Sequence, residues 1–168
     1  FSFSGTSLTV QTEDVKCNGG TNGRATALIS GGLSPHSFNW SNGQVGNITS
    51  INNLSAGNYS VIVTDSRGCQ STMPFTINEP NAVNPNVTQT NNPCEGAHLG
   101  TITINPSGGS YPYSILWADN STTFSLSGLL SGYYIYVITD GNNCILKDTV
   151  SIINTGSLNT SITKKDNN

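Results

Sequence analysis

Short stretches in which every second residue is apolar recur along the whole chain. The clearest is Asn58–Val63, where Tyr59, Val61 and Val63 fall on one side of the backbone. A period of two is the pattern of a β-strand with one buried face. In the first half of the chain, five further stretches are expected to be strands for the same reason: 7–12, 24–30, 37–40, 47–53 and 73–78.

The chain has no stretch with the apolar spacing of an amphipathic helix, and good helix formers are scarce. Turn-forming Gly, Pro and Asn interrupt the strands about every ten residues. Six or seven short strands with such turns predict an antiparallel β-sandwich. The fold class is therefore all-β and immunoglobulin-like.

The pattern of one half repeats in the other. The segment from Cys17 to Cys69 aligns with the segment from Cys94 to Cys144, and one two-residue deletion between Trp117 and Leu129 accounts for the change in offset. A fixed period of this length indicates tandem small domains. The pairs at an offset of 77 are Cys17/Cys94, Gly32/Gly109, Pro35/Pro112 and Trp40/Trp117; those at 75 are Leu54/Leu129, Gly57/Gly132, Tyr59/Tyr134, Asp65/Asp140 and Cys69/Cys144.

This alignment predicts four segments. Residues 1–6 are the end of a preceding unit or a leader, 7–80 are the first repeat, 81–156 are the second, and 157–168 begin a truncated third. Pro80 and Pro85 lie where the repeats join, so we expect a stiff connection between them.

Composition excludes several classes of function. Charged residues make up only 9% of the chain, the net charge is −3 and the pI is about 5.0. Without a basic patch, nucleic acid is not an expected partner. No apolar run approaches the roughly 18 residues that suggest a membrane span. A surface rich in Asn, Ser, Thr and Gly is common in secreted adhesive proteins.

The four cysteines at matched positions favour one disulfide within each repeat, Cys17–Cys69 and Cys94–Cys144. A bridge over a loop of this length would contribute roughly 4 kcal/mol in the chain-entropy model. Disulfides would place the protein outside the reducing cytoplasm. A metal site is the alternative, but the sequence contains no CxxC pair.

Three further matched pairs suggest structural roles, and two of these pairs also have a competing role. Trp40 and Trp117 are expected in the two cores, with a sugar-stacking platform as the alternative. Tyr59 and Tyr134 resemble tyrosine corners, whose hydroxyls bond to nearby backbone, although they could instead bind a ligand. Asp65 and Asp140 are expected to cap the turns that precede the second cysteines.

Two groups of residues in the second repeat are candidate ligand contacts. Tyr133, Ile135 and Val137 are predicted on the outward side of a strand and form an unusually apolar face, which a partner, a loop or the neighbouring domain could cover. Tyr111 and Tyr113 flank Pro112 in an end loop, where sandwich folds commonly bind ligands.

Neither a cofactor nor catalysis is expected. The acidic residues are scattered, so calcium, which needs six to eight oxygen ligands, is possible but has no supporting motif. His36 and His98 lie at unmatched positions, and the chain contains neither GxSxG nor HExxH. The sequence therefore predicts no catalytic residue and no metal site.

The chain resembles the SprB repeat of Bacteroidota cell-surface proteins in four places: CNGGTNGRATALISGG, P-x-x-F-x-W-SNG, LSAGNYSVIVTDSRGC and FTINEP. The resemblance implies type IX secretion, attachment to the bacterial outer surface, and adhesion to surfaces or polysaccharides, as in the gliding-motility adhesin of this family.

We therefore expect a non-catalytic segment of a large adhesin that acts as an extended stalk and display module. The expected partners are adjacent repeats of the same chain, with a surface polysaccharide or a protein as further candidates. One alternative is a carbohydrate-binding module that uses the exposed tyrosines. The other is a protein-recognition domain.

Overall fold

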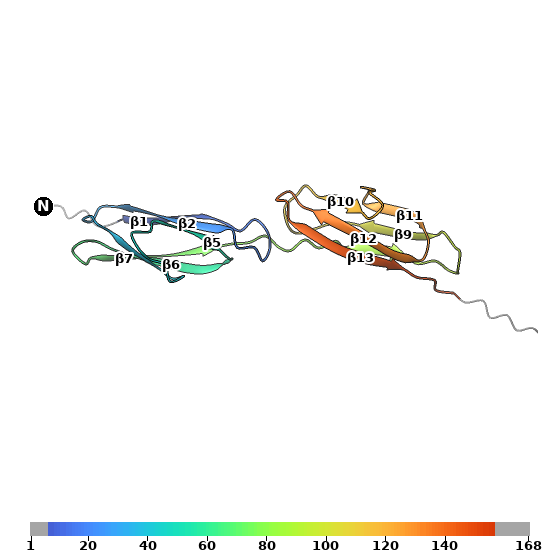
Figure 1. Ribbon diagram of the computed structural model, residues 1–168, viewed down its shortest axis with the longest axis horizontal. Helices are drawn as coiled ribbons and strands as arrows, with labels where there is room; N and C mark the ends of the chain where they lie inside the picture. Colours follow the sequence, from blue (N-terminus) through green and yellow to red (C-terminus); the bar gives the residue numbers. More distant parts are fainter. Residues whose placement is uncertain (1–6, 157–168) are drawn as a thin grey trace, which may run out of the picture. The chain divides into compact units, whose positions relative to one another are not determined.

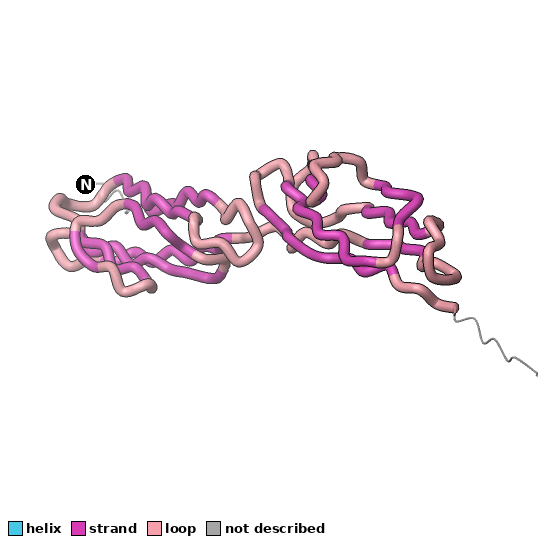
Figure 2. The backbone as a smooth tube through the Cα atoms, turned by 45° about the vertical axis from the view of Figure 1, so that its right-hand side comes forward, coloured by secondary structure: helices cyan, strands magenta, loops and turns pink. Residues whose placement is uncertain are grey.

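The computed structural model describes residues 7–156; the proposed preceding unit (1–6) and third repeat (157–168) lie outside the described residues. The described chain consists of strands, turns and loops, with no helix (Figures 1 and 2). It divides into two compact units, with the boundary between Ala82 and Val83. We call them repeat 1 and repeat 2.

Repeat 1 is an antiparallel sandwich of two sheets. One sheet has the order β1-β2-β5 and the other the order β4-β3-β6-β7. Its strands are β1 (Ser7–Glu13), β2 (Gly23–Ser30), β3 (Ser37–Trp40), β4 (Val45–Gly46), β5 (Ser50–Leu54), β6 (Gly57–Thr64) and β7 (Gln70–Ile77).

Repeat 2 repeats this arrangement with one strand fewer. Its sheets have the orders β11-β9-β8 and β10-β12-β13, again with every pair antiparallel. The strands are β8 (Val87–Thr90), β9 (Gly100–Ile104), β10 (Ser114–Trp117), β11 (Ser125–Leu129), β12 (Gly132–Thr139) and β13 (Ile145–Ile152). The all-β, immunoglobulin-like fold class is confirmed.

Alternation along the strands builds each core. In β6, Val61 and Val63 are buried, and at the matched positions of β12 the buried residues are Tyr136 and Ile138.

The hydroxyl of Tyr136 donates to Asp148 at 3.4 Å. Burial and the negative charge of Asp148 raise the pKa of this phenol to about 12, so it stays neutral.

The tryptophan of the third strand links the two sheets of each repeat. Trp40 and Trp117 are almost completely buried, as predicted for core residues. The indole N–H of Trp40 donates to the Ile48 carbonyl, and that of Trp117 to the Thr123 carbonyl, both at 2.8 Å. Each acceptor precedes a strand of the opposite sheet, so a buried polar atom is satisfied where the chain crosses between layers.

The two-residue deletion in repeat 2 removes strand β4. The main-chain N–H of each tryptophan donates to the following turn, at Gln44 in repeat 1 and at Ser121 in repeat 2, both at 2.9 Å. The segment from Gln44 to Ile48, whose carbonyl accepts the indole N–H in repeat 1, is two residues longer than the corresponding segment of repeat 2, which starts at Ser121. Among the described residues, β10 consequently pairs only with β12 and forms a sheet edge.

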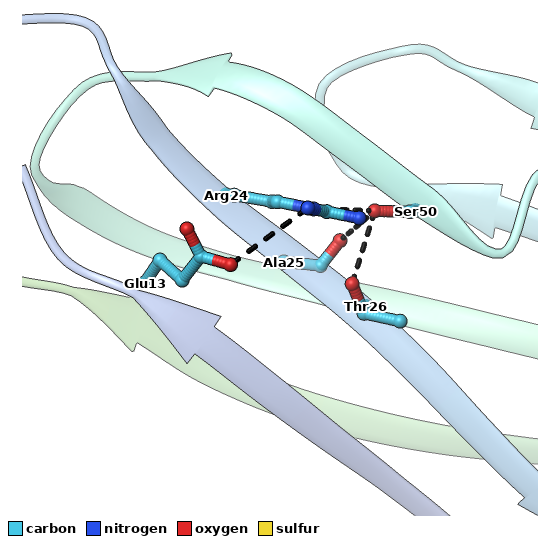
Figure 3. Close-up of polar contacts among 5 residues, drawn as sticks. All are labelled: Glu13, Arg24, Ala25, Thr26 and Ser50. Carbon is cyan, nitrogen blue, oxygen red and sulfur yellow. Dashed lines mark hydrogen bonds and ion pairs between the residues drawn. The ribbon is translucent and has the colours of Figure 1, made fainter.

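Polar side chains connect three strands on the solvent-facing side of the β1-β2-β5 sheet (Figure 3). The Ser50 hydroxyl accepts from Arg24 Nε at 3.1 Å, donates to the Ala25 carbonyl at 3.2 Å and lies 3.0 Å from the Thr26 hydroxyl. A guanidinium nitrogen of Arg24 lies 3.8 Å from the Glu13 carboxylate. Both side chains of this ion pair are exposed, so it contributes little to stability.

The predicted disulfides within each repeat are wrong. Cys17 and Cys144 are disulfide-bonded, whereas Cys69 and Cys94 are free and exposed. In repeat 1, Cys69 directly precedes β7, and the turn that contains Cys17 is bonded to the residues directly after β7. Eight residues at roughly 3.3 Å each separate these ends by about 26 Å, whereas a disulfide needs Cα atoms within about 7 Å.

Both predicted tyrosine corners are present. The Tyr59 hydroxyl donates to the Ser55 carbonyl at 3.1 Å, and the Tyr134 hydroxyl donates to the Leu130 carbonyl at 2.9 Å. In each case the acceptor lies four residues upstream, across the turn that leads into β6 or β12. The two hydrogen bonds therefore hold the chain where it enters β6 and β12.

Replacing Tyr134 by Phe should lower the free energy of unfolding by about 1 kcal/mol, because one neutral hydrogen bond is lost without a cavity. Tyr59→Phe should have a similar effect. Urea unfolding followed by tryptophan fluorescence measures both. Tyr133→Phe is the control, since that side chain is 83% exposed; an equal loss in the control would contradict the assignment.

Candidate functional site

One candidate site is an open cavity at one end of repeat 2. It has a volume of about 520 Å³ and lies beside the loop between β9 and β10. Tyr111 is 85% exposed, and its ring meets the ring of Tyr113 edge to face, with centroids 6.1 Å apart. The lining residues are Ile104, Asn105, Pro106, Tyr111, Tyr113 and Phe124.

Hydrogen bonds hold this loop in place. The Tyr113 hydroxyl donates to the Gly108 carbonyl. The Gly141 N–H donates to the Ser110 carbonyl at 2.6 Å, and the Asn142 amide donates to the Ser110 hydroxyl at 2.8 Å. The loop is thus bonded both to itself and to the turn between β12 and β13.

Asp140 is the first residue of that turn and stabilises it. Its carboxylate accepts the main-chain N–H groups of Asn142, Cys144 and Ser110 at 2.8–2.9 Å. Burial acts to raise its pKa, but the three N–H groups outweigh burial and hold the pKa below the ordinary value. One buried carboxylate therefore caps its own turn, as predicted, and also holds the loop that carries Tyr111.

Repeat 1 has the same scaffold without the aromatic residues. Asp65 accepts the N–H groups of Arg67 and Cys69 at 2.9 Å and that of Leu33 at 3.3 Å. These hydrogen bonds, that of Cys69 foremost, lower the pKa of Asp65 although burial opposes them. Ser34 and His36 occupy the positions of Tyr111 and Tyr113.

The second candidate group lies elsewhere on repeat 2. Tyr133 and Ile135 are 83% and 41% exposed, Val137 is partly buried, and all three share the outward side of β12. Leu116 of the edge strand β10 pairs with Val137 and is 47% exposed, so it extends this face.

The structure does not bring these two groups into one site. Tyr133 lies at the start of β12, where it lines a separate cavity beside Ile152 and Ile153. The loop of Tyr111 lies near Asp140, just beyond the end of β12. An eight-residue strand of roughly 25 Å separates them, so they would contact different ligands or different parts of a large one.

Two of the residues that shape these surfaces were not predicted from the sequence. Phe124 takes the place of Thr49, as the main-chain hydrogen bonds from Ile104 and Ala27 show. Leu116 faces outward because its neighbours Ile115 and Trp117 are buried. Realigning the repeats after the deletion and extending the alternation to residues 114–117 would have indicated both.

Two windows of the chain, 9–45 and 86–122, match the family model described as SprB repeat. The windows are offset by 77 residues, the same offset that relates Cys17 to Cys94. Each of the two repeats thus contains a segment that matches the SprB repeat model. The second segment includes Tyr111 and Tyr113, so most residues of the candidate cavity lie within it.

A search of curated proteins finds no match to this chain. Among solved structures, the chain is similar to an intimin fragment in complex with the translocated intimin receptor, with 12% sequence identity and a TM-score of 0.45. This match covers 88% of the chain and 64% of the fragment. The eight N-terminal domains of Down syndrome cell adhesion molecule match with 13% identity and a TM-score of 0.41. This match covers 90% of the present chain and 25% of the solved one. Fibronectin(III)-like modules of Clostridium thermocellum CbhA match with 12% identity and a TM-score of 0.32. This match covers 93% of the present chain and 100% of the solved one.

Among residues 7–156, no group of three or more His, Cys, Asp and Glu side chains is arranged to hold a metal ion. The cavity beside Tyr111 is instead lined by aromatic rings, a proline and one amide side chain. Such a surface suits stacking against a sugar ring or a peptide group.

The loop of Tyr111 should respond to pH only below about 4. The folded-state pKa of Asp140 lies below its unfolded value, so its contribution to stability is complete above pH 4 and is lost as pH falls through the folded-state pKa. NMR signals of Tyr111 and Tyr113 should therefore stay constant down to about pH 4 and then shift.

Asp140→Asn should remove this transition, whereas Asp65→Asn should leave it unchanged, because Asp65 holds the matched loop of repeat 1. A transition that persists in Asp140→Asn would contradict the role of this carboxylate.

Proposed function

We propose that this chain is a non-catalytic segment of a large secreted cell-surface adhesin, where it serves as an extended stalk and display module for surface attachment and gliding motility. The two matches to the SprB repeat model support this proposal. The observation that carries it is the duplication of a self-contained sandwich: matched residues build the cores, whereas the exposed aromatic residues are unmatched. Within the described residues, no helix has the length and apolar character to cross a membrane.

The path of the chain through each repeat suits a stalk. In repeat 1, β1 starts beside Ser30, near the turn of Asp65, and the chain leaves beyond Ile77 at the opposite end. In repeat 2, Asn84 bridges to Ser107 at one end, and the chain leaves beyond Ile152 at the other. A domain with its termini at opposite ends adds its full length to an array.

A stalk also requires stiff joints, which the prolines of the connection favour. Small-angle scattering should give a narrow distribution of distances between the repeats, and replacing Pro80 and Pro85 by Gly should broaden it. If the native chain already gave a distribution as broad as that of the double variant, the stalk proposal would fail.

A carbohydrate-binding role for repeat 2 is the second candidate, and the cavity beside Tyr111 favours it. Its lining contains no charged side chain, which suits a neutral polysaccharide. Tyr111 projects into solvent while the loop beneath it is held by Asp140. A ring presented in this way loses little conformational freedom when it stacks against a sugar.

Glycan-array screening followed by titration calorimetry tests this second role. Tyr111→Ala should weaken binding about tenfold or more, since burying an aromatic side chain is worth about 1.5–3 kcal/mol. Tyr133→Ala is a matched control, because Tyr133 is equally exposed at the other end of the same repeat. Equal losses in both variants, or no glycan bound, would reject the cavity as a sugar site.

A protein-recognition role is the third candidate. The face formed by Leu116, Ile135 and Val137 favours it, because exposed apolar residues that adjoin one another are typical of contact surfaces.

A further inference from the structure

The two cysteines of each repeat in this chain occupy opposite ends of the sandwich. We call the end at which the chain enters a repeat its leading end and the other its trailing end. The second cysteine of each repeat lies at the leading end. In repeat 1 the turn of Cys69 is bonded through Asp65 to Leu33, and in repeat 2 the turn of Cys144 is bonded through Asp140 to Ser110.

The first cysteine of each repeat lies at the trailing end. In repeat 1, the Gly19 N–H near Cys17 donates to the Glu79 carboxylate at 2.5 Å, just after β7 ends. In repeat 2, Asn92 near Cys94 is fully buried and donates its main-chain N–H to the Ile153 carbonyl, just after β13 ends.

This placement leaves each cysteine without a possible partner in its own repeat, since the length of a sandwich separates the two positions. Each position is nevertheless able to form a disulfide: the trailing-end residue Cys17 and the leading-end residue Cys144 are both bonded. Their counterparts, Cys94 at a trailing end and Cys69 at a leading end, are free and exposed. The free pair thus has the same complementary placement as the bonded positions.

We propose that Cys94 and Cys69 are the two halves of a covalent connection between repeats, in which the trailing-end cysteine of one repeat bonds to the leading-end cysteine of another. For this chain, the partner is a second copy of itself joined head to tail. Such a contact is heterologous and can continue into a linear series.

The reaction is thiol–disulfide exchange with a disulfide oxidant such as oxidised glutathione. The Cys94 thiolate attacks a glutathione sulfur and releases one glutathione thiolate. The Cys69 thiolate of the second copy then attacks the Cys94 sulfur of this mixed disulfide and releases the other. The two protein thiols lose two protons and two electrons, and one oxidised glutathione becomes two reduced molecules.

Both free thiols project from fixed turns. The Cys69 N–H is bonded to Asp65 at 2.9 Å, and the Cys94 carbonyl accepts the Ala97 N–H at 3.3 Å. Asn92, two residues before Cys94, also accepts the Leu99 N–H and donates to the Leu129 carbonyl. Such anchoring limits the directions from which a second copy can approach, which favours one pairing over random thiol collisions.

Two single variants test the proposal. Cys69→Ser retains only the trailing-end thiol and Cys94→Ser retains only the leading-end thiol, while Cys17 and Cys144 stay intact in both. Each protein, with its fold checked by near-UV circular dichroism, is incubated with a mixture of oxidised and reduced glutathione and analysed by non-reducing electrophoresis.

The unaltered chain should form a ladder of dimers and longer species that dithiothreitol dissolves. Each variant alone should stay monomeric, and an equal mixture of the two should give a dimer and nothing longer. Chymotrypsin cleaves after Phe75 and so separates Cys69 from Cys94, which allows mass spectrometry to identify a Cys69–Cys94 peptide.

Four results would overturn the proposal. Dimers in either variant alone, as abundant as in the mixture, would indicate unspecific thiol coupling. Loss of both thiols in a species that remains monomeric and carries no bound glutathione would indicate a bond within one molecule, whereas monomers that keep glutathione on both cysteines would show that the two positions do not couple. Thiols that stay free under oxidation would show that these positions do not couple.

Discussion

The buried indole of the third strand is the contact on which each sandwich depends. Trp40 and Trp117 occupy the space between two sheets, and each donates its only polar hydrogen to the backbone where the chain crosses to the opposite sheet. A large apolar ring with one satisfied donor adds both burial and direction. This contact is present in both repeats, whereas β4 has no equivalent in repeat 2, so the edge strand is dispensable for the sandwich.

Several differences between the repeats lie on loops and sheet edges, away from the shared tryptophan contact. Ser34 and His36 become Tyr111 and Tyr113 on a loop that an aspartate holds in both repeats. Without an equivalent of β4, strand β10 lies at the edge of its sheet, and its residue Leu116 is exposed. The interior keeps its apolar character although single residues differ, as Val61 and Tyr136 do. One fold can acquire new contact surfaces at its ends and edges, because surface changes there cost little stability.

The alternation of apolar residues predicted six strands of repeat 1 with boundaries close to the observed ones, since burial of one face selects both register and length. Strand β4 was missed because two residues, Val45 and Gly46, are too few to show a period. The disulfides were predicted wrongly because matched spacing identifies equivalent cysteines but carries no information on which end of a sandwich each turn occupies. The candidate loop was found from Tyr111 and Tyr113, whereas Phe124 was missed because it enters the cavity only through the pairing of distant strands.

Placing cysteines at opposite ends changes what a disulfide can do for a repeat. A bridge within a sandwich would limit how far that domain's own chain can extend when it unfolds, and would leave the joint to the next domain to the peptide alone. Bridges from trailing end to leading end would instead give each joint a second covalent connection beside a proline-containing linker. The joint would then resist bending, and a repeat that lost its fold would remain tied to its neighbours. In a stalk built from a series of such domains, cysteines at the ends of each repeat are therefore placed to limit bending at the joints.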